Sequence, residues 1–242
     1  MLPMQKSRIA ALLLLAMCAV AQQPPTVDIT SEPSHHLVLQ NEYVRVFDVT
    51  VAPRASTLVH RHDHDYLFVT LGDADVVSTR PGEQPVHLTL KDGETRFTAG
   101  NFAHAALNLS DQPFHNITID LLQPSTGVKT CTESCSMPVP CPAEAKAACP
   151  TIERRILSDQ WVLSFVNIPP ASRLEKHTHA VPHLVVAVSN LDLTQQTDAS
   201  TSAAKRAPGS LVWVPASVTH TISNGSANAA KFITLEFTAN TK

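Results

Sequence analysis

Residues 53–71 read PRASTLVHRHDHDYLFVTL, and residues 170–188 read PASRLEKHTHAVPHLVVAV. In both stretches a proline stands seven residues before the first histidine, a His-X-His pair follows, and an apolar run comes soon after it. Residues 93–108 (GETRFTAGNFAHAALN) and 209–224 (GSLVWVPASVTHTISN) also match, because in both the histidine lies eleven residues after the glycine and four before the asparagine. These shared spacings predict a tandem duplication with an offset of about 116 residues.

Each copy is rich in strand signals. The segment VRVFDVTV at 44–51 contains alternating β-branched residues, and residues 67–71 and 184–188 are apolar runs short enough for buried strands. Turn signals such as Lys91-Asp92-Gly93 recur at short intervals. The predicted class is therefore all-β, with a sandwich or jelly-roll barrel in each copy.

Composition excludes several functional classes. The chain has 242 residues, of which 43% are hydrophobic and 16% charged, as expected of a globular protein. Its 18 Lys+Arg against 21 Asp+Glu give a formal charge of -3. Because a protein that coats nucleic acid needs an excess of cations, we expect no nucleic-acid partner.

The N-terminus resembles a secretory signal peptide. Lys6 and Arg8 precede the apolar run 9–20, and Ala19-Val20-Ala21 offers small residues at the positions that a signal peptidase reads. Cleavage after Ala21 predicts a secreted or periplasmic protein with no membrane association afterwards. An uncleaved anchor and a lipoprotein attached through Cys18 remain alternatives, although the run is shorter than a bilayer requires.

Four cysteines outside the signal peptide lie close together in a Pro-rich segment, at Cys131, Cys135, Cys141 and Cys149. An even number in an exported chain predicts two local disulfides of undetermined pairing. A structural zinc site is the alternative, although the paired Cys-X-X-Cys of zinc ribbons is missing. The predicted organisation is a signal peptide (1–21), an N-terminal domain (22–128), a Cys/Pro-rich connector (129–150) and a C-terminal domain (151–242).

The histidines are the candidate functional residues. Because residues two apart in a strand project to the same side, His60 and His62 should point into one interior. The same holds for His177 and His179, and a histidine from a later strand can approach the same point. The candidate metal ligands are His60, His62 and His104 in the first copy, and His177, His179, His183 and His220 in the second. Tyr66 occupies the position of His183 in the first copy.

These two motifs, present twice, resemble the signature motifs of the cupin superfamily, so the chain is similar to a secreted bicupin over residues 36–125 and 152–238. The resemblance implies two double-stranded β-helix barrels, each holding Mn, Fe, Ni, Cu or Zn, and it implies the seven histidines above as ligands. The chain departs from the family pattern where a glutamate is usual, since Tyr66 and His183 stand there. The usual proline is Pro215 in the second copy but Ala99 in the first. An all-histidine ligand set is more similar to that of three-His dioxygenase cupins and small four-His manganese cupins than to that of the germin type.

Neutral imidazoles suit borderline divalent transition metals and not Mg²⁺ or Ca²⁺. Without a carboxylate ligand the ion keeps its full charge and should attract small anionic chelating molecules. We therefore expect a metal-dependent oxygenase or a lyase/isomerase that acts on a small oxygenated acid or dicarbonyl. The alternatives are a non-catalytic bicupin that binds a sugar, a metabolite or a metal, and a metal-free scaffold. No catalytic residue or oligomeric state is predicted, and the unrepeated His35, His36, His87 and His115 receive no role, while His64 is placed at a pocket rim.

Overall fold

The computed structural model describes residues 25–132, 135–141 and 149–238. The predicted signal peptide, residues 1–21, lies outside these ranges. Within them the backbone is almost entirely extended, and the helical content is one 3-10 turn at Ile29–Ser31 (η1). No helix in the described part has the length and apolar character needed to cross a membrane.

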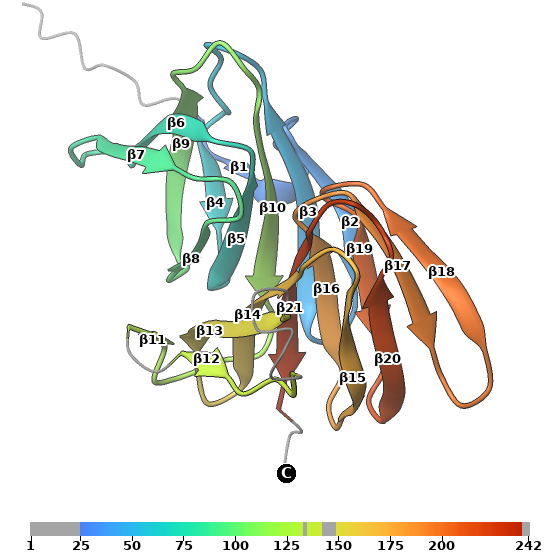
Figure 1. Cartoon of the computed structure of the whole chain (residues 1–242). Helices are drawn as coiled ribbons and strands as arrows, with labels where there is room; N and C mark the ends of the chain where they lie inside the picture. Colours follow the sequence, from blue (N-terminus) through green and yellow to red (C-terminus); the bar gives the residue numbers. More distant parts are fainter. Residues whose placement is uncertain (1–24, 133–134, 142–148, 239–242) are drawn as a thin grey trace, which may run out of the picture.

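The N-terminal half forms two five-stranded sheets (Figure 1). The first has the order β1-β4-β9-β6-β7, with strands Val27–Asp28, His60–His62, Phe102–Asn108, Ala74–Thr79 and Val86–Leu90. The second has the order β2-β3-β10-β5-β8, with strands His35–Gln40, Val44–Val51, Phe114–Leu121, Tyr66–Leu71 and Thr95–Thr98. Phe47, Val76 and Phe114 come from both sheets and pack in one buried cluster, so the sheets enclose a common interior.

The C-terminal half repeats this plan. Its larger sheet has the order β11-β13-β14-β21-β16-β19, with strands Lys129–Thr130, Thr151–Leu157, Trp161–Ile168, Ala230–Phe237, His183–Ala187 and Leu211–Val214. The smaller sheet has the order β15-β20-β17-β18, with strands Ser172–His179, Val218–Asn224, Leu191–Gln196 and Thr201–Arg206. Val166, Leu193 and Phe232 pack between the sheets. The all-β prediction is confirmed.

The cysteines of the connector form two disulfides, between Cys131 and Cys135 and between Cys141 and Cys149. The predicted two local disulfides are thus present, and they join the first cysteine to the second and the third to the fourth. The connector also adds strands to the C-terminal barrel, because β11 and β12 (Ser136–Met137) both pair with β13.

A further apolar core joins the two barrels. In β3, Phe47 and Val49 face the interior of their own barrel, whereas Val44 and Val46 belong to a cluster shared by both halves. The shared cluster contains Val44, Val46, Leu67, Val69, Ile117, Ile119 and Leu121 from the first half and Ile156, Trp161, Leu163, Leu184, Val186, Val188, Ile233, Leu235 and Phe237 from the second. Figure 1 shows β3 and β10 beside β16 and β21. Strands buried on both faces explain why the sequence shows continuous apolar runs there.

Two equivalent glycines lie where the barrels meet. Gly93 has a positive φ of 71°, and a Cβ added there would lie 3.1 Å from side-chain atoms of both Phe165 and Val188. Gly209 has a φ of 82°, and a Cβ there would lie 3.2 Å from Leu71. Each glycine therefore makes its turn against the other barrel, so the contact between the copies is reciprocal.

The repeated asparagines hold equivalent turns. Asn108 is buried, and its Nδ2 donates to the carbonyl oxygens of Val51 (3.2 Å), Ala52 (3.2 Å) and Gln112 (2.8 Å). The same bonds recur from Asn224 to the carbonyl oxygens of Ile168, Pro169 and Asn228. Each asparagine thus ties the end of the strand that carries the third histidine, β9 or β20, to the end of β3 or β14.

Replacing Asn108 or Asn224 by alanine is expected to lower the free energy of unfolding by about 2 to 3 kcal/mol, because buried carbonyl oxygens lose their donor. Urea unfolding of the two variants, beside the exposed control Asn190→Ala, measures this loss. A change as small as that of the control would mean that the bonds do not hold the turns.

Candidate metal centres

Three histidines of the first copy converge inside the N-terminal barrel. His60 and His62 lie on β4, and His104 lies opposite His60 on the neighbouring strand β9. The Nε2 atom of His62 is 3.2 Å from the Nε2 atom of His60 and 3.2 Å from the Nε2 atom of His104. His60 and His62 are almost fully buried, with exposed fractions of 1% and 2%. We call these three residues the N-terminal site.

Three histidines of the second copy converge in the same way. His177 and His179 lie on β15, and His220 lies opposite His177 on β20. The Nε2 atoms of His177 and His220 are 3.1 Å apart, and ligand nitrogens of the three residues all lie within 4.8 Å of one another. These residues form the C-terminal site, which is more exposed than the first because His177 and His179 are only half-buried.

The outer nitrogens of these rings are held by backbone and side-chain groups. The Nδ1 atom of His60 is 3.0 Å from the carbonyl oxygen of Leu58, and that of His177 is 2.7 Å from the carbonyl oxygen of Glu175. Since a carbonyl oxygen only accepts, Nδ1 carries the proton and Nε2 of the neutral ring directs a lone pair inward. The Nδ1 atom of His104 lies 2.8 Å from Ser78 Oγ.

Convergent lone pairs are the arrangement that a cation requires. A proton on His62 Nε2 would serve only one of the two Nε2 atoms, of His60 and of His104, that lie 3.2 Å from it, whereas a cation attracts all three lone pairs. Two nitrogens that each lie about 2.1 Å from one metal ion are separated by roughly 3.0 to 3.4 Å, depending on the angle at the metal. The Nε2 separations of 3.1 to 3.2 Å lie in that range. The residues present therefore fit a divalent transition metal ion in both sites.

Burial keeps these imidazoles in the form that binds metal. Desolvation, reinforced by neighbouring histidines, lowers the pKa of His60 to about 4 and the pKa of His104 to about 2. In the second copy it lowers the pKa of His220 to about 4, and it also lowers the pKa of His177. These rings are therefore neutral at pH 7 and do not have to release a proton when a metal binds.

The same shifts predict that the metal-free protein loses stability in mild acid. In the unfolded chain a histidine titrates near pH 6.5, whereas His60 and His220 in the fold titrate near 4. Between these values the unfolded chain binds more protons than the fold, so the free energy of unfolding falls as the pH is lowered. Chelated protein melted at pH 7.5, 6.5 and 5.5, above the range where most carboxylates titrate, should show a steadily falling Tm. A constant Tm would contradict the neutral, buried state.

One further position at the sites differs between the copies. Tyr66 stacks on His62 with a centroid distance of 4.1 Å, and its counterpart His183 lies 4.0 Å from the ring of His179. The predicted ligand His183 is thus brought beside the C-terminal site, but the group of histidines whose nitrogens lie close enough to hold an ion does not include it, so His183 as a ligand stays a prediction. His64 lies half-buried between β4 and β5.

A carboxylate stands behind the second histidine of each site. Glu236 Oε1 accepts a hydrogen bond from His179 Nδ1 at 2.8 Å, and this bond lowers the pKa of Glu236 against the opposing effect of burial. In the first copy Asp120 Oδ1 is 3.9 Å from His62 Nδ1, while Oδ2 accepts from Arg45. Such carboxylates orient a ligating histidine and strengthen it as a donor. The motif search missed both, although ITIDL at 117–121 and ITLEF at 233–237 match at the repeat offset.

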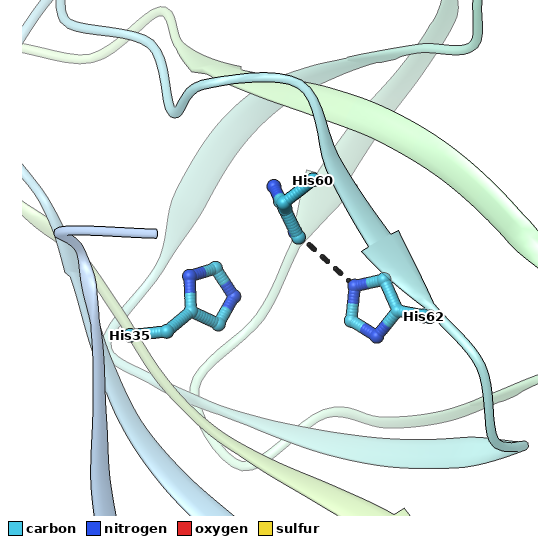
Figure 2. Close-up of side chains that lie close together, drawn as sticks. All are labelled: His35, His60 and His62. Carbon is cyan, nitrogen blue, oxygen red and sulfur yellow. Dashed lines mark hydrogen bonds between the residues drawn. The ribbon is translucent and has the colours of Figure 1, made fainter. Parts of the chain in front are cut away.

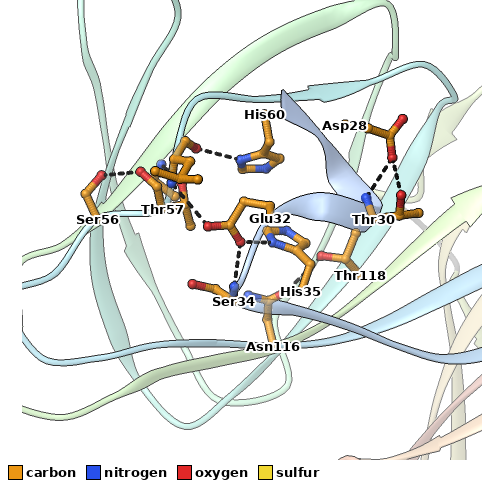
Figure 3. Close-up of polar contacts among 12 residues, drawn as sticks. Asp28, Thr30, Glu32, Ser34, His35, Ser56, Thr57, His60, Asn116 and Thr118 are labelled. Atoms are coloured by element: carbon orange, nitrogen blue, oxygen red, sulfur yellow. Dashed lines mark hydrogen bonds and ion pairs between the residues drawn. The ribbon is translucent and has the colours of Figure 1, made fainter. Parts of the chain in front are cut away.

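His35 is a second residue that the sequence analysis left without a role. It begins β2 and lies beside the N-terminal site, with ring centroids 4.5 Å from His60 and 6.4 Å from His62 (Figure 2). Its Nδ1 atom is 2.7 Å from Glu32 Oε2 (Figure 3). Because its position has no histidine in the second copy, the repeat could not identify it.

Each site opens into a cavity. The N-terminal cavity measures about 400 Å³, and Arg80, whose guanidinium carbon is 3.8 Å from the centroid of Phe102, lines it with the histidines. The C-terminal cavity measures about 540 Å³ and is bordered by connector residues 137–140. Its walls are largely apolar and include Val166, Leu174, Leu191, Val212, Ile222 and Phe232. Both cavities are large enough for a small molecule beside the histidines.

No protein-family model matches the sequence, and no curated protein matches it. Solved structures match its fold. AerE from Microcystis aeruginosa aligns over 86% of this chain and 99% of its own, with 11% identity and a TM-score of 0.58. Oxalate decarboxylase from Bacillus subtilis aligns over 81% of this chain and 68% of its own, with 12% identity and a TM-score of 0.55.

The chain has the two-barrel cupin fold. This confirms the predicted fold class, two tandem jelly-roll barrels, and it agrees with the histidine-rich motifs and with their position inside each barrel. At 11% to 12% identity the likeness concerns the fold alone. Another structure of the Bacillus subtilis oxalate decarboxylase, with a TM-score of 0.54 over 81% of this chain and 69% of its own, concerns the Mn(II) centres of that enzyme.

Proposed function

We propose that this chain is an exported metal-binding bicupin that uses a divalent transition metal ion to act on a small oxygenated acid or dicarbonyl compound. The observation that carries the proposal is the convergence of three imidazole nitrogens in each barrel: Nε2 of His62 lies 3.2 Å from those of His60 and His104, and nitrogens of His177, His179 and His220 lie within 4.8 Å of one another. The predicted signal peptide and the two disulfides support export.

In each site three imidazoles would hold the ion: His60, His62 and His104 in one, and His177, His179 and His220 in the other. When bound, the ion supplies Lewis acidity or a place for O₂, and its charge stays uncompensated by these ligands. Groups that accept hydrogen bonds from Nδ1 keep the imidazole rings oriented towards the ion. Leu58 and Glu175 fix the proton on Nδ1 through their carbonyl oxygens.

The cavity walls support a small acid or dicarbonyl as the substrate class. Arg80 gives the N-terminal cavity a cation, and Arg206 lies at the border of the C-terminal cavity, where Lys176 is already paired with Asp198. A carboxylate or enolate of the substrate could thus meet a positive charge as well as the metal. The apolar walls of the C-terminal cavity favour a substrate with a carbon skeleton larger than two carbons, since they exclude water around it.

Elemental analysis of the mature protein purified without chelator tests the metal, and O₂ uptake with substrate depletion tests the activity. A panel of hydroxy acids, β-diketones, dicarboxylic acids and phenols should be offered to protein loaded with Fe²⁺ or Mn²⁺. We expect stoichiometric metal and turnover of at least one acid or dicarbonyl. Metal binding without turnover of any compound would assign the chain to the non-catalytic binders instead, and failure to bind metal after reloading would contradict the proposal entirely.

A further inference from the structure

The pair Glu32 and His35 is a buried polar unit beside the N-terminal site. The side chains are 2% and 5% exposed, and Glu32 Oε2 lies 2.7 Å from His35 Nδ1. The same oxygen accepts from the backbone N–H of Ser34 at 2.8 Å, and Oε1 accepts from the N–H of Leu58 at 3.1 Å. Both oxygens are thus acceptors, so Nδ1 of His35 is the donor in this pair (Figure 3).

This hydrogen bond determines which ring nitrogen of His35 is available as a ligand. With Nδ1 committed to Glu32, its other ring nitrogen, Nε2, is the one left to bind elsewhere. One ligand nitrogen from each of His35, His60 and His62 can be chosen so that all lie within 4.8 Å of one another, and the three are buried; His104 is not in this group but joins it through His62, whose Nε2 atom lies 3.2 Å from its own. Figure 2 shows the three rings around a common space. Metal-ligating histidines typically donate a hydrogen bond to a carboxylate from the ring N–H that does not face the metal.

The second copy has no such unit. His35 pairs with Val49 of β3, and at the equivalent register of β13 and β14 it is Ile152 that pairs with Val166. Ile152 lines the C-terminal cavity with an apolar side chain. If His35 only filled space in the barrel, an apolar residue would serve there as Ile152 does in the second copy, and the carboxylate of Glu32 would need only the backbone N–H groups of Ser34 and Leu58.

We propose that His35, oriented by Glu32, is a fourth imidazole ligand of the metal in the N-terminal site, which makes that site a four-histidine centre and leaves the C-terminal site with three. The inference rests on the proposed function, because it presupposes that the N-terminal site holds a metal. The N-terminal metal then has fewer positions for exogenous ligands, and the C-terminal site, with its larger cavity, is the more open of the two.

The test counts the ligands of the N-terminal site alone. In the full-length variant His177→Ala/His179→Ala, loaded with Co²⁺, each ligating imidazole should give one paramagnetically shifted, exchangeable N–H proton signal in the NMR spectrum. We expect four signals, and three after the further change His35→Ala. Chelator competition should show a metal affinity about 10- to 100-fold lower in the variant that also carries His35→Ala. Glu32→Gln should lower the metal affinity by a similar factor while keeping four signals.

His36→Ala is the matched control, because His36 is the exposed neighbour on the same strand; it should leave both readouts unchanged. His35→Gln, together with circular dichroism, guards against loss of folding by His35→Ala. Three signals in the parent, or an affinity unaffected by His35 substitution in folded protein, would overturn the four-histidine centre. Metal in the C-terminal site of the wild type but none in the N-terminal site would overturn it as well and leave the proposed function standing, whereas metal in neither site would remove the proposed function itself.

Discussion

Replacing His177 and His179 together by alanine is expected to remove one of two metal ions bound per chain, and replacing His60 and His62 together is expected to remove the other. Each double substitution deletes two of the imidazoles that converge in its barrel. The single remaining histidine of the C-terminal site cannot hold a divalent ion at neutral pH, so the affinity should fall by several orders of magnitude. Because the sites lie in separate barrels, the losses should be independent.

Elemental analysis of both variants and of the wild type, purified side by side without chelator, measures the effect. The exposed pair His36→Ala/His87→Ala is a control for histidines that bind metal adventitiously, and it should keep both ions. Loss of one ion in only one of the double variants would restrict the metal to that barrel. Retention of full metal content in both double variants would contradict the assignment of these histidines as ligands.

The repeat in the sequence explains why the fold and most of the site could be predicted. His60, His62 and His104 share their spacing with His177, His179 and His220, and strand alternation places each set inside a barrel. In the structure the first and third histidines of each copy lie opposite each other on paired strands, His60 with His104 and His177 with His220. Periodicity and repetition are properties of the chain, so they can be read without knowing which strands become neighbours.

Residues that act through long-range neighbours could not be found in this way. His35 and Glu32 have no counterparts in the second copy, where Ile152 takes the place of His35. Asp120 and Glu236 are repeated, but their position behind the second histidine depends on how the last strand of each half packs. The interaction of Tyr66 and His183 with the ring of that histidine likewise depends on side-chain orientation, which strand parity does not determine.

The packing of the two barrels against each other could not be predicted from the sequence either. Ile119 and Leu235 are equivalent in the repeat, and each is buried, with exposed fractions of 1% and 0%. Both belong to the core that the halves share, whereas an apolar run by itself is compatible with burial inside a single barrel. The two halves therefore stabilise each other, and a defect at their contact should affect both.

An aspartate at Ile119 or at Leu235 is expected to destabilise the whole chain by more than about 4 kcal/mol, because a charge without a partner would be buried in the shared core. Since that core contains strands of both barrels, we expect each single substitution to unfold the two halves together. Thermal unfolding followed by circular dichroism, with limited proteolysis to identify which half is cleaved, measures this.

The two substitutions are a matched pair, because one enters the core from the N-terminal half and the other from the C-terminal half. Thr50→Asp, at an exposed position of β3, is the control and should change the free energy of unfolding by less than about 1 kcal/mol. If the cores were independent, Leu235→Asp would leave the N-terminal barrel resistant to protease and its metal bound, and Ile119→Asp would do the reverse. Equal loss of protection and of both metal ions in the two variants is the result that a shared core requires, because neither barrel can bury alone the sheet face that it packs against the other barrel.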